Sequence, residues 1–273
     1  MSAAAEKQII LITGIGATNG IGLDTTIFLV ADSPNNHVIM GARSVNKAEA
    51  KMKEIQAKNP KGTLSYVQLD VNDDESSLEA VKKIKEDFGR LDVLVNNAGI
   101  CPENTPPPEK PQGTPQLWAS RKDMRDTFET NVYGVMVLTE AAIPLLKTSK
   151  NPMVINVTSG LGSIEALNPS LDPSNSLYSY KDVRGPAYRM SKAALNMMTT
   201  YQYAQLRGDG FKIWAYCPGY VVSDLTNDRE AREQMQWCES SETSAQGILD
   251  IVHGERDADA GKFITKRGGI YPW

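Results

Sequence analysis

Short apolar runs alternate along this chain with longer stretches in which apolar residues recur at helical spacing. Most of the runs are apolar throughout, without alternating polar residues, and they are rich in valine and isoleucine. They span residues 8–13, 37–42, 63–69, 91–97, 153–159, 212–217 and 262–265. Strands that are buried on both faces have this pattern, which favours a parallel sheet. Helical patterns occupy the intervals, at about residues 20–32, 44–58, 74–88, 116–148, 187–207 and 227–253.

This alternation predicts an α/β fold. We expect a single doubly wound Rossmann domain over residues 1–273, with about seven parallel strands, right-handed crossovers and helices on both faces. Ligands of such sheets bind beyond the carboxyl ends of the strands, where the strand order reverses. Two segments break the alternation: 101–115, with six prolines, and 163–186, rich in Pro, Asn and Ser. Each follows a predicted strand end, so we expect loop insertions over the active site.

Composition narrows the functional classes. The 273 residues carry 29 Lys and Arg against 33 Asp and Glu, a net charge of −4. No basic stripe is present, which argues against nucleic acid and membrane surfaces as partners. Three separated cysteines (Cys101, Cys217 and Cys238) without a CxxC pair argue against a disulfide framework or a zinc site and fit a reducing compartment. No signal-peptide pattern or membrane-length apolar run is apparent, so we predict a cytoplasmic location.

Glycines are concentrated directly after the first predicted strand, in ITGIGATNGIG (12–22). Gly16, Gly20 and Gly22 have the spacing GxxxGxG at a strand–helix junction. There, glycines permit a tight turn, close approach of a pyrophosphate and close packing of helix on strand. The positive end of the helix would then face the phosphates. An ordinary glycine-rich turn is the alternative, and the missing Lys-Ser/Thr pair excludes a P-loop.

The end of the second predicted strand, GARS, bears on which dinucleotide would bind. A carboxylate at this place binds the ribose hydroxyls of NAD, whereas an arginine accommodates the 2′-phosphate of NADP. Here Ala42 is followed by Arg43, whose planar fork suits a phosphate. We therefore predict NADPH or NADP⁺ as the cofactor, with a solvated arginine as the alternative interpretation.

Tyr188 and Lys192 are four residues apart in YRMSK, at the start of a predicted helix, and so share one helix face. A tyrosine with its ordinary pKa of about 10 exchanges protons poorly at neutral pH. A lysine cation one turn away favours the phenolate and lowers that pKa. This is the chain's only YxxxK, although such a pair also arises by chance.

Further polar motifs follow successive strands. NNAG (96–99) ends the fourth predicted strand, Ser159 ends the fifth, CPGYVVSDL (217–225) follows the sixth, and Asn131 lies within a predicted helix. With these motifs in order over nearly the whole chain, the sequence resembles the short-chain dehydrogenase/reductase family, in its carbonyl-reductase-like, single-domain form.

The resemblance implies a catalytic set. Tyr188 would donate a proton to the substrate carbonyl oxygen as hydride arrives from the nicotinamide. Lys192 would hold the nicotinamide ribose and bias Tyr188, while Ser159 would hydrogen-bond the substrate oxygen. Asn131 would anchor a water leading toward Lys192.

The resemblance also implies a cofactor-binding set. Asp70 would lie by the adenine, Asn97 in the cofactor cleft, and Val221 and Ser223 at the carboxamide, with Ser223 replacing the more common threonine. The full set is Gly16, Asn19, Gly20, Ile21, Gly22, Arg43, Asp70, Asn97, Tyr188, Lys192, Val221 and Ser223.

Two departures from the family pattern stand out. The family usually has TGxxxGxG, but five residues separate Thr13-Gly14 from Gly20, so the loop is two residues longer and Gly14 could allow a bulge. Ser159 and Tyr188 are 29 residues apart rather than about a dozen. Related carbonyl reductases and menthone-reductase-like members also carry an insertion there, which in some covers a face used for oligomer contacts, so a homo-oligomer and a monomer both stay open.

The insertion also suggests a covered pocket for a bulky, apolar ketone. Four aromatic residues could line it or pack elsewhere: Trp118, Tyr178, Tyr180 and Tyr220. We predict an NADPH-dependent oxidoreductase that reduces such a small-molecule carbonyl to an alcohol, or the reverse. The alternatives are a non-catalytic NADP(H)-binding sensor and a non-redox enzyme on the same fold. A hydrolase is unsupported because GxSxG is absent and neither histidine belongs to a recognisable triad.

Overall fold

A seven-stranded parallel sheet forms the centre of the molecule. The computed structural model describes residues 7–15, 20–102, 119–167, 185–226, 229–236 and 238–273. The strands are β1 (Gln8–Ile12), β2 (Asn36–Ala42), β3 (Thr63–Gln68), β4 (Val93–Asn96), β5 (Met153–Val157), β6 (Lys212–Cys217) and β7 (Phe263–Thr265). Their order, β3-β2-β1-β4-β5-β6-β7, reverses between β1 and β4, so the predicted doubly wound Rossmann fold is confirmed.

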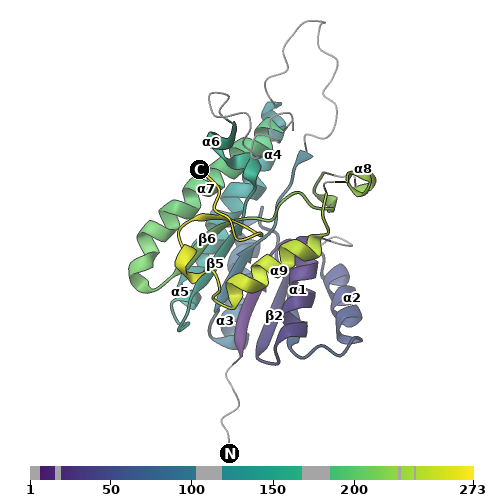
Figure 1. Ribbon diagram of the computed structural model, residues 1–273. Coiled ribbons are helices and arrows are strands. Elements are labelled where there is room, and N and C mark those ends of the chain that lie inside the picture. The colour runs from purple at the N-terminus through teal and green to yellow at the C-terminus, as the bar shows by residue number, and fades with distance from the viewer. Residues whose placement is uncertain (1–6, 16–19, 103–118, 168–184, 227–228, 237) are drawn as a thin grey trace, which may run out of the picture.

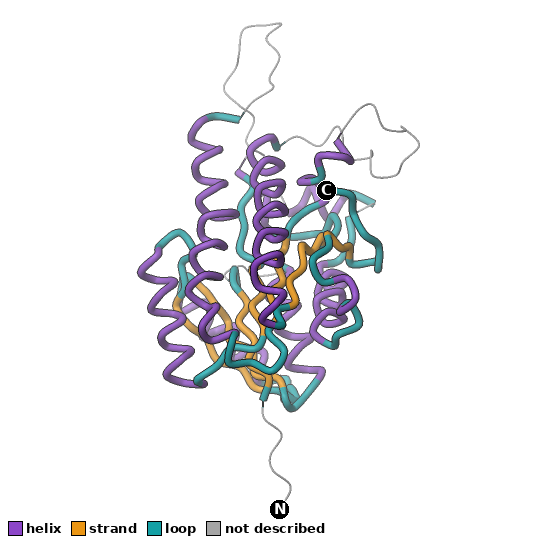
Figure 2. The backbone as a smooth tube through the Cα atoms, turned by 90° about the vertical axis from the view of Figure 1, so that its left-hand side faces the viewer, coloured by secondary structure: helices purple, strands orange, loops and turns teal. Residues whose placement is uncertain are grey.

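Helices cover both faces of the sheet (Figure 1). On one face lie α1 (Ile21–Asp32), α2 (Val45–Gln56) and α9 (Ser241–Val252); on the other lie α3 (Asp74–Phe88), α5 (Gly134–Leu146) and α7 (Pro186–Leu206). Figure 2 looks onto the second face, where long helices cross in front of the strands. Within β1, Ile10 and Ile12 enter one hydrophobic core, while Ile9 and Leu11 enter the other. The period-2 geometry of a strand thus divides one continuous apolar run between two cores.

Local sequence signals explain several helix boundaries. The Asp73 carboxylate accepts a hydrogen bond from Ser76 N at the start of α3, and Gly89 ends that helix in the left-handed conformation. Ser120 and Asp123 form a capping box at the start of α4 (Arg121–Phe128). Pro186 occupies the first turn of α7, where its missing N–H is tolerated.

Three expected segments differ from the structure. The helix expected over 116–148 is divided into α4, a π-helical turn at Glu129–Tyr133 and α5. The helix expected over 227–253 is divided into α8 (Arg229–Gln234) and α9, because Ser240 caps a new helix at Glu242 N. Within the loop expected over 163–186, Ile164–Leu167 forms the short helix α6. Most of both predicted insertions, 103–115 and 168–184, lies outside the described residues.

A buried chain of amides joins the two central strands to the helices above them. Asn96 Nδ2 donates to Asn156 Oδ1 at 2.8 Å, and Asn156 Nδ2 donates to Thr199 Oγ1 on α7 at 2.9 Å. Asn96 Nδ2 also reaches Thr139 Oγ1 on α5 at 3.0 Å. Because buried amides are costly to leave unpaired, these bonds fix α5 and α7 relative to the ends of β4 and β5.

Substitution of Gly134 by alanine tests the close approach of α5 to the loop after β3. A Cβ at Gly134 would overlap the Val71 carbonyl oxygen and stand 2.9 Å from Val71 Cβ. We expect Gly134→Ala to lower the free energy of unfolding by about 1–3 kcal/mol, as overpacking does. Urea denaturation measures this loss. Gly208→Ala is the control, because no atom lies within 4 Å of its added Cβ; equal stability of the two variants would contradict the close approach.

Candidate active site

Three side chains of the predicted catalytic set come together at the carboxyl edge of the sheet. Lys192 Nζ donates to the carbonyl oxygen of Val157, the last residue of β5, at 2.8 Å. The same ammonium lies 5.6 Å from the centre of the Tyr188 ring, one helical turn earlier on α7. The Ser159 side chain, two residues beyond β5, lies beside the Tyr188 side chain, where its hydroxyl favours the phenolate. Phenol, ammonium and alcohol groups therefore converge at this edge, with Tyr188 and Lys192 on one helix face as their spacing predicted.

Burial dominates the acid–base properties of this cluster. It raises the pKa of Tyr188 far above its ordinary value of 10, with the nearby Cys101 thiol adding to the rise and the Ser159 hydroxyl opposing it. Burial likewise lowers the pKa of Lys192 to about 8. The expectation that the lysine cation leaves Tyr188 with a lowered pKa is therefore wrong for the protein without ligand, because removing the phenolate from water outweighs the favourable charges.

Asn131 occupies the π-helical turn between α4 and α5 and is fully buried. Its Oδ1 accepts from Ile100 N at 2.9 Å, and its Nδ2 donates to Ile100 O and to Ser191 Oγ, both at 3.0 Å. A Cβ placed on Gly99 would lie 3.3 Å from Asn131 Oδ1 and 3.6 Å from Lys192 Nζ. The amide thus holds the segment after β4 close to Lys192, a positioning that the sequence did not reveal.

The loops after β1 and β4 are tied together by hydrogen bonds. Thr13 Oγ1 accepts from the backbone N–H groups of Asn97 and Ala98 at 3.0 Å each, and Asn97 Nδ2 donates to Thr13 O at 2.8 Å. Gly14 has φ +77°, and a Cβ there would stand 2.7 Å from Ala98 Cα. This contact, rather than a bulge alone, requires glycine at position 14. Gly22 is similarly constrained, since its Cβ would meet Asn97 Nδ2 at 2.6 Å.

The start of α1 fits a phosphate group. Gly20 precedes the helix with φ 152° and has no atom within 4 Å of an added Cβ, so the backbone is open on that side. No side chain among the described residues caps the helix, so its first N–H groups are available to an anion. Ile21 and Gly22 form the first turn. Gly16 and Asn19, also predicted to bind the cofactor, lie outside the described residues.

Comparisons with known proteins agree with this geometry. The family model described as short chain dehydrogenase matches residues 8–170. A short-chain dehydrogenase/reductase from Phoma sp., eupG, is 33% identical over 100% of both chains. The chain belongs to the short-chain dehydrogenase/reductase family. It is therefore an oxidoreductase on a fold that binds a nicotinamide cofactor, and the resemblance drawn from the motifs is confirmed.

Two further relatives extend over nearly the whole length of this short-chain dehydrogenase/reductase. The short-chain dehydrogenase/reductase tropE from Talaromyces stipitatus is 29% identical, over 98% of this chain and 99% of its own. An NADPH-bound carbonyl reductase from chicken fatty liver has 26% sequence identity and a TM-score of 0.78, covering 98% of this chain and 100% of its own. The structural similarity thus extends to a carbonyl reductase.

Two of the dehydrogenase's predicted cofactor residues lie where neighbouring strands β2 and β3 end. Arg43 follows β2 directly, is exposed, and makes no ion pair or hydrogen bond within the described part of the chain. Asp70 is half-buried two residues beyond β3, and its carboxylate accepts from Asn72 N at 3.1 Å in a turn. Leu69 N bonds Ala42 O at 3.0 Å, which keeps these two strand ends adjacent.

The loop after β6 contains Val221 and Ser223, both buried. A side chain that the motifs did not single out, Arg232 of α8, lies against this loop: its Nη1 donates to Val221 O at 2.7 Å and to Ser223 Oγ at 3.4 Å. Arg232 belongs to a segment whose pattern predicted only an amphipathic helix. Its charge also favours the phenolate of Tyr188, although burial prevails in setting that pKa.

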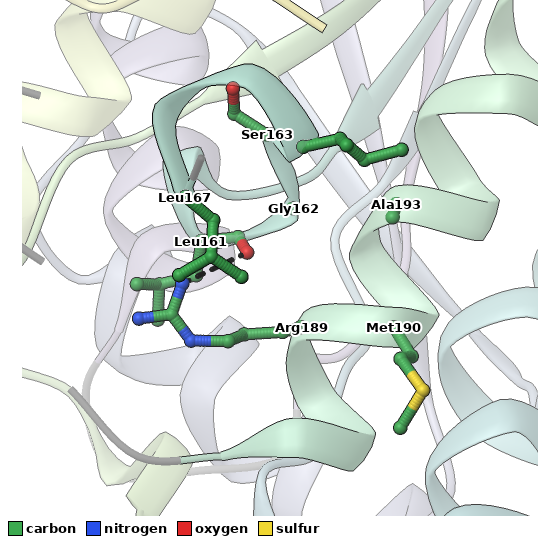
Figure 3. Close-up of a pocket in the computed structure, with 8 residues that line it drawn as sticks. Leu161, Gly162, Ser163, Leu167, Arg189, Met190 and Ala193 are labelled. Carbon is green, nitrogen blue, oxygen red and sulfur yellow. Dashed lines mark hydrogen bonds between the residues drawn. The ribbon is translucent and has the colours of Figure 1, made fainter. Parts of the chain in front are cut away.

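A separate cavity of about 360 Å³ lies between α6 and the outer side of α7 (Figure 3). Its lining includes Ile164, Leu167, Arg189 and Met190, and Arg189 Nη1 donates to Leu161 O at 3.4 Å. Neither Ser159 nor Tyr188 lines it, so it is distinct from the catalytic cluster. Trp118, Tyr178 and Tyr180, predicted as possible pocket aromatics, lie outside the described residues.

The lowered pKa of Lys192 predicts a pH-dependent stability. Between about pH 8 and pH 10, the unfolded chain, in which a lysine has a pKa near 10.5, binds more protons at this residue than the folded protein. Stability from this group therefore rises with pH through that window. In urea titrations without ligand, Lys192→Met should reduce that rise, whereas Lys83→Met, on the surface of α3, should keep it. If stability rises equally with pH in both variants, the lowered pKa of Lys192 is contradicted.

Proposed function

We propose that this short-chain dehydrogenase/reductase uses NADPH to reduce the carbonyl of a small, bulky, apolar ketone to an alcohol. The observation that carries the proposal is the buried Tyr188 phenol, which lies beside Ser159 and 5.6 Å from the Lys192 ammonium at the carboxyl edge of the sheet. A phenol and an alcohol that lie side by side can both hydrogen-bond one carbonyl oxygen placed between them.

The chain's own residues would handle the proton and the developing charge. The bound cofactor supplies the hydride to the carbonyl carbon. Tyr188 transfers its phenolic proton to the carbonyl oxygen, and the Ser159 hydroxyl donates a hydrogen bond to that oxygen as negative charge develops there. Lys192, held by Val157 O, stabilises the phenolate that remains on Tyr188. Asn131 keeps the segment after β4 in place beside this group.

The acid–base state of the cluster supports the reductive direction. Burial keeps Tyr188 protonated at neutral pH, which is the form that a proton donor requires. Lys192, with a pKa of about 8, is mostly charged at pH 7. A sensor that only binds NADP(H) has no use for a buried proton donor, and this argues against the non-catalytic alternative.

The preference for NADPH rests on Arg43. Its exposed guanidinium follows β2, beside the turn that contains Asp70, where the adenosine end of a dinucleotide would lie. A planar guanidinium binds a phosphate with two parallel hydrogen bonds. The NADPH bound to the chicken carbonyl reductase is consistent with this choice.

Substitution of Tyr188 by phenylalanine tests the proton donor. We expect it to lower kcat for ketone reduction by at least about 100-fold, the usual contribution of general acid catalysis, because phenylalanine has no proton to give. The measurement is NADPH absorbance loss with a panel of ketones.

Tyr201→Phe is the matched control, since Tyr201 is 65% exposed on the same helix. It should leave turnover unchanged. Turnover that survives in Tyr188→Phe would refute the assigned acid. Tight NADPH binding by the wild type without oxidation of NADPH on any ketone would favour the sensor or the non-redox alternative.

Substitution of Arg43 by alanine tests the choice of cofactor. Losing hydrogen bonds to a charged phosphate costs about 1.5–3 kcal/mol, so NADPH affinity should fall roughly 10- to 100-fold. NADH affinity should change little, because NADH lacks the 2′-phosphate. Fluorescence titration with NADPH and with NADH measures the two affinities. Lys53→Ala, at the far end of α2, is the control. Equal losses for the two cofactors would defeat the prediction.

A further inference from the structure

The short helix α8 carries a buried arginine, Arg232, which is only 7% exposed. Its guanidinium carbon lies 4.6 Å from the centre of the Tyr220 ring, and its Nη1 donates to Val221 O and Ser223 Oγ. Arginine is rarely buried to this extent without hydrogen-bond acceptors. All three contacts fall within four consecutive residues of the loop after β6, so the side chain is directed at this loop.

The opposite side of the loop is held by backbone bonds. Val222 N donates to Glu239 O at 2.9 Å, and Glu239 N donates to Tyr220 O at 3.0 Å, which forms an isolated parallel bridge. Glu239 is itself ion-paired with Lys266 at 3.0 Å. The bridge fixes the backbone of the loop, but it does not reach the Ser223 hydroxyl. Among the hydrogen bonds of the described residues, the bond donated by Arg232 is the one that reaches the Ser223 hydroxyl.

The direction of that hydrogen bond has a chemical consequence. A guanidinium has only N–H donors, so Ser223 Oγ accepts from Arg232 and its own proton remains available for donation. The Val221 carbonyl has two lone pairs and accepts one hydrogen bond from the same nitrogen. The loop therefore offers a hydroxyl donor beside a carbonyl acceptor. A carboxamide, with one acceptor oxygen and an NH₂ donor, is complementary to this pair.

We propose that Arg232 is a positioning residue for the nicotinamide carboxamide: it orients the Ser223 hydroxyl and the Val221 carbonyl toward the cofactor. The inference rests on the proposed function and on the expectation, drawn from the family resemblance, that Val221 and Ser223 meet that carboxamide. In this proposal Arg232 acts through these two groups.

A double-mutant cycle on NADPH affinity tests the inference. The variants are Ser223→Ala, Arg232→Met and the combination, with NADPH binding followed by fluorescence titration. Ser223→Ala should weaken binding roughly 3- to 10-fold in the wild-type background, the range for one hydrogen bond. In the Arg232→Met background it should weaken binding less than about twofold, because the hydroxyl has already lost its orientation.

Two further variants separate positioning from charge and from folding. Arg232→Lys keeps the positive charge near Tyr188 but lacks the planar fork, so it should follow Arg232→Met in binding. If Arg232→Met fails to fold, Arg232→Lys takes its place in the double-mutant cycle. Arg229→Met removes an arginine from the same helix, one that pairs with Asp224 and Glu233, and should bind NADPH as the wild type does.

The outcomes distinguish this inference from the proposed function. If the wild type binds NADPH but Ser223→Ala costs the same factor in both backgrounds, Arg232 does not position Ser223 and only the inference fails. If Arg232→Met binds NADPH as tightly as the wild type does, the inference is overturned as well. If the wild type binds no NADPH, the proposed function fails and this inference fails with it.

Discussion

The hydrogen bond from Lys192 to the Val157 carbonyl is the contact on which the geometry of this site depends. It joins α7 to the end of β5, at the carboxyl edge of the sheet. Tyr188 lies one turn earlier on the same helix and Ser159 two residues beyond the same strand, so this bond, with the Asn156–Thr199 bond nearby, keeps the two side chains together. An ammonium ion that is 3% exposed needs such a partner, since an unpaired buried charge is very costly.

The surroundings of this bond consist mostly of groups that prevent movement. Asn131 fixes the segment after β4, Thr13 joins that segment to the loop after β1, and Thr158 donates to Asn196 of α7 at 2.7 Å. Gly162 lets the turn after Ser159 approach α7 so closely that a Cβ would stand 2.6 Å from the Lys192 carbonyl carbon. The site is thus preorganised, and its electrostatics follow from burial: a phenol that stays protonated beside a lysine whose pKa is depressed.

The two ends of the proposed cofactor site are built differently. At the end proposed for the adenosine, an exposed arginine and an open glycine turn leave room for a charged ligand. At the end proposed for the nicotinamide, Val221 and Ser223 of the loop after β6 are buried, and the loop is held by Glu239 and Arg232. A reactive ring must be placed to within a fraction of an ångström, whereas a phosphate is held by charge over a broader range.

The sequence by itself determined the sheet and the helices that cover it, because hydrophobic period is a local property. The family resemblance of its motifs singled out Ser159, Tyr188 and Lys192, which the structure brings together. The sequence did not determine where α4 gives way to α5 or α8 to α9, since a π-turn and a serine cap interrupt patterns that look continuous. The contacts of Asn131 and Arg232 were decided only by the tertiary structure. Each contacts residues far along the chain or beyond its own helix. Burial sets the pKa of Tyr188, and a side chain is buried only once the helices have packed on the sheet.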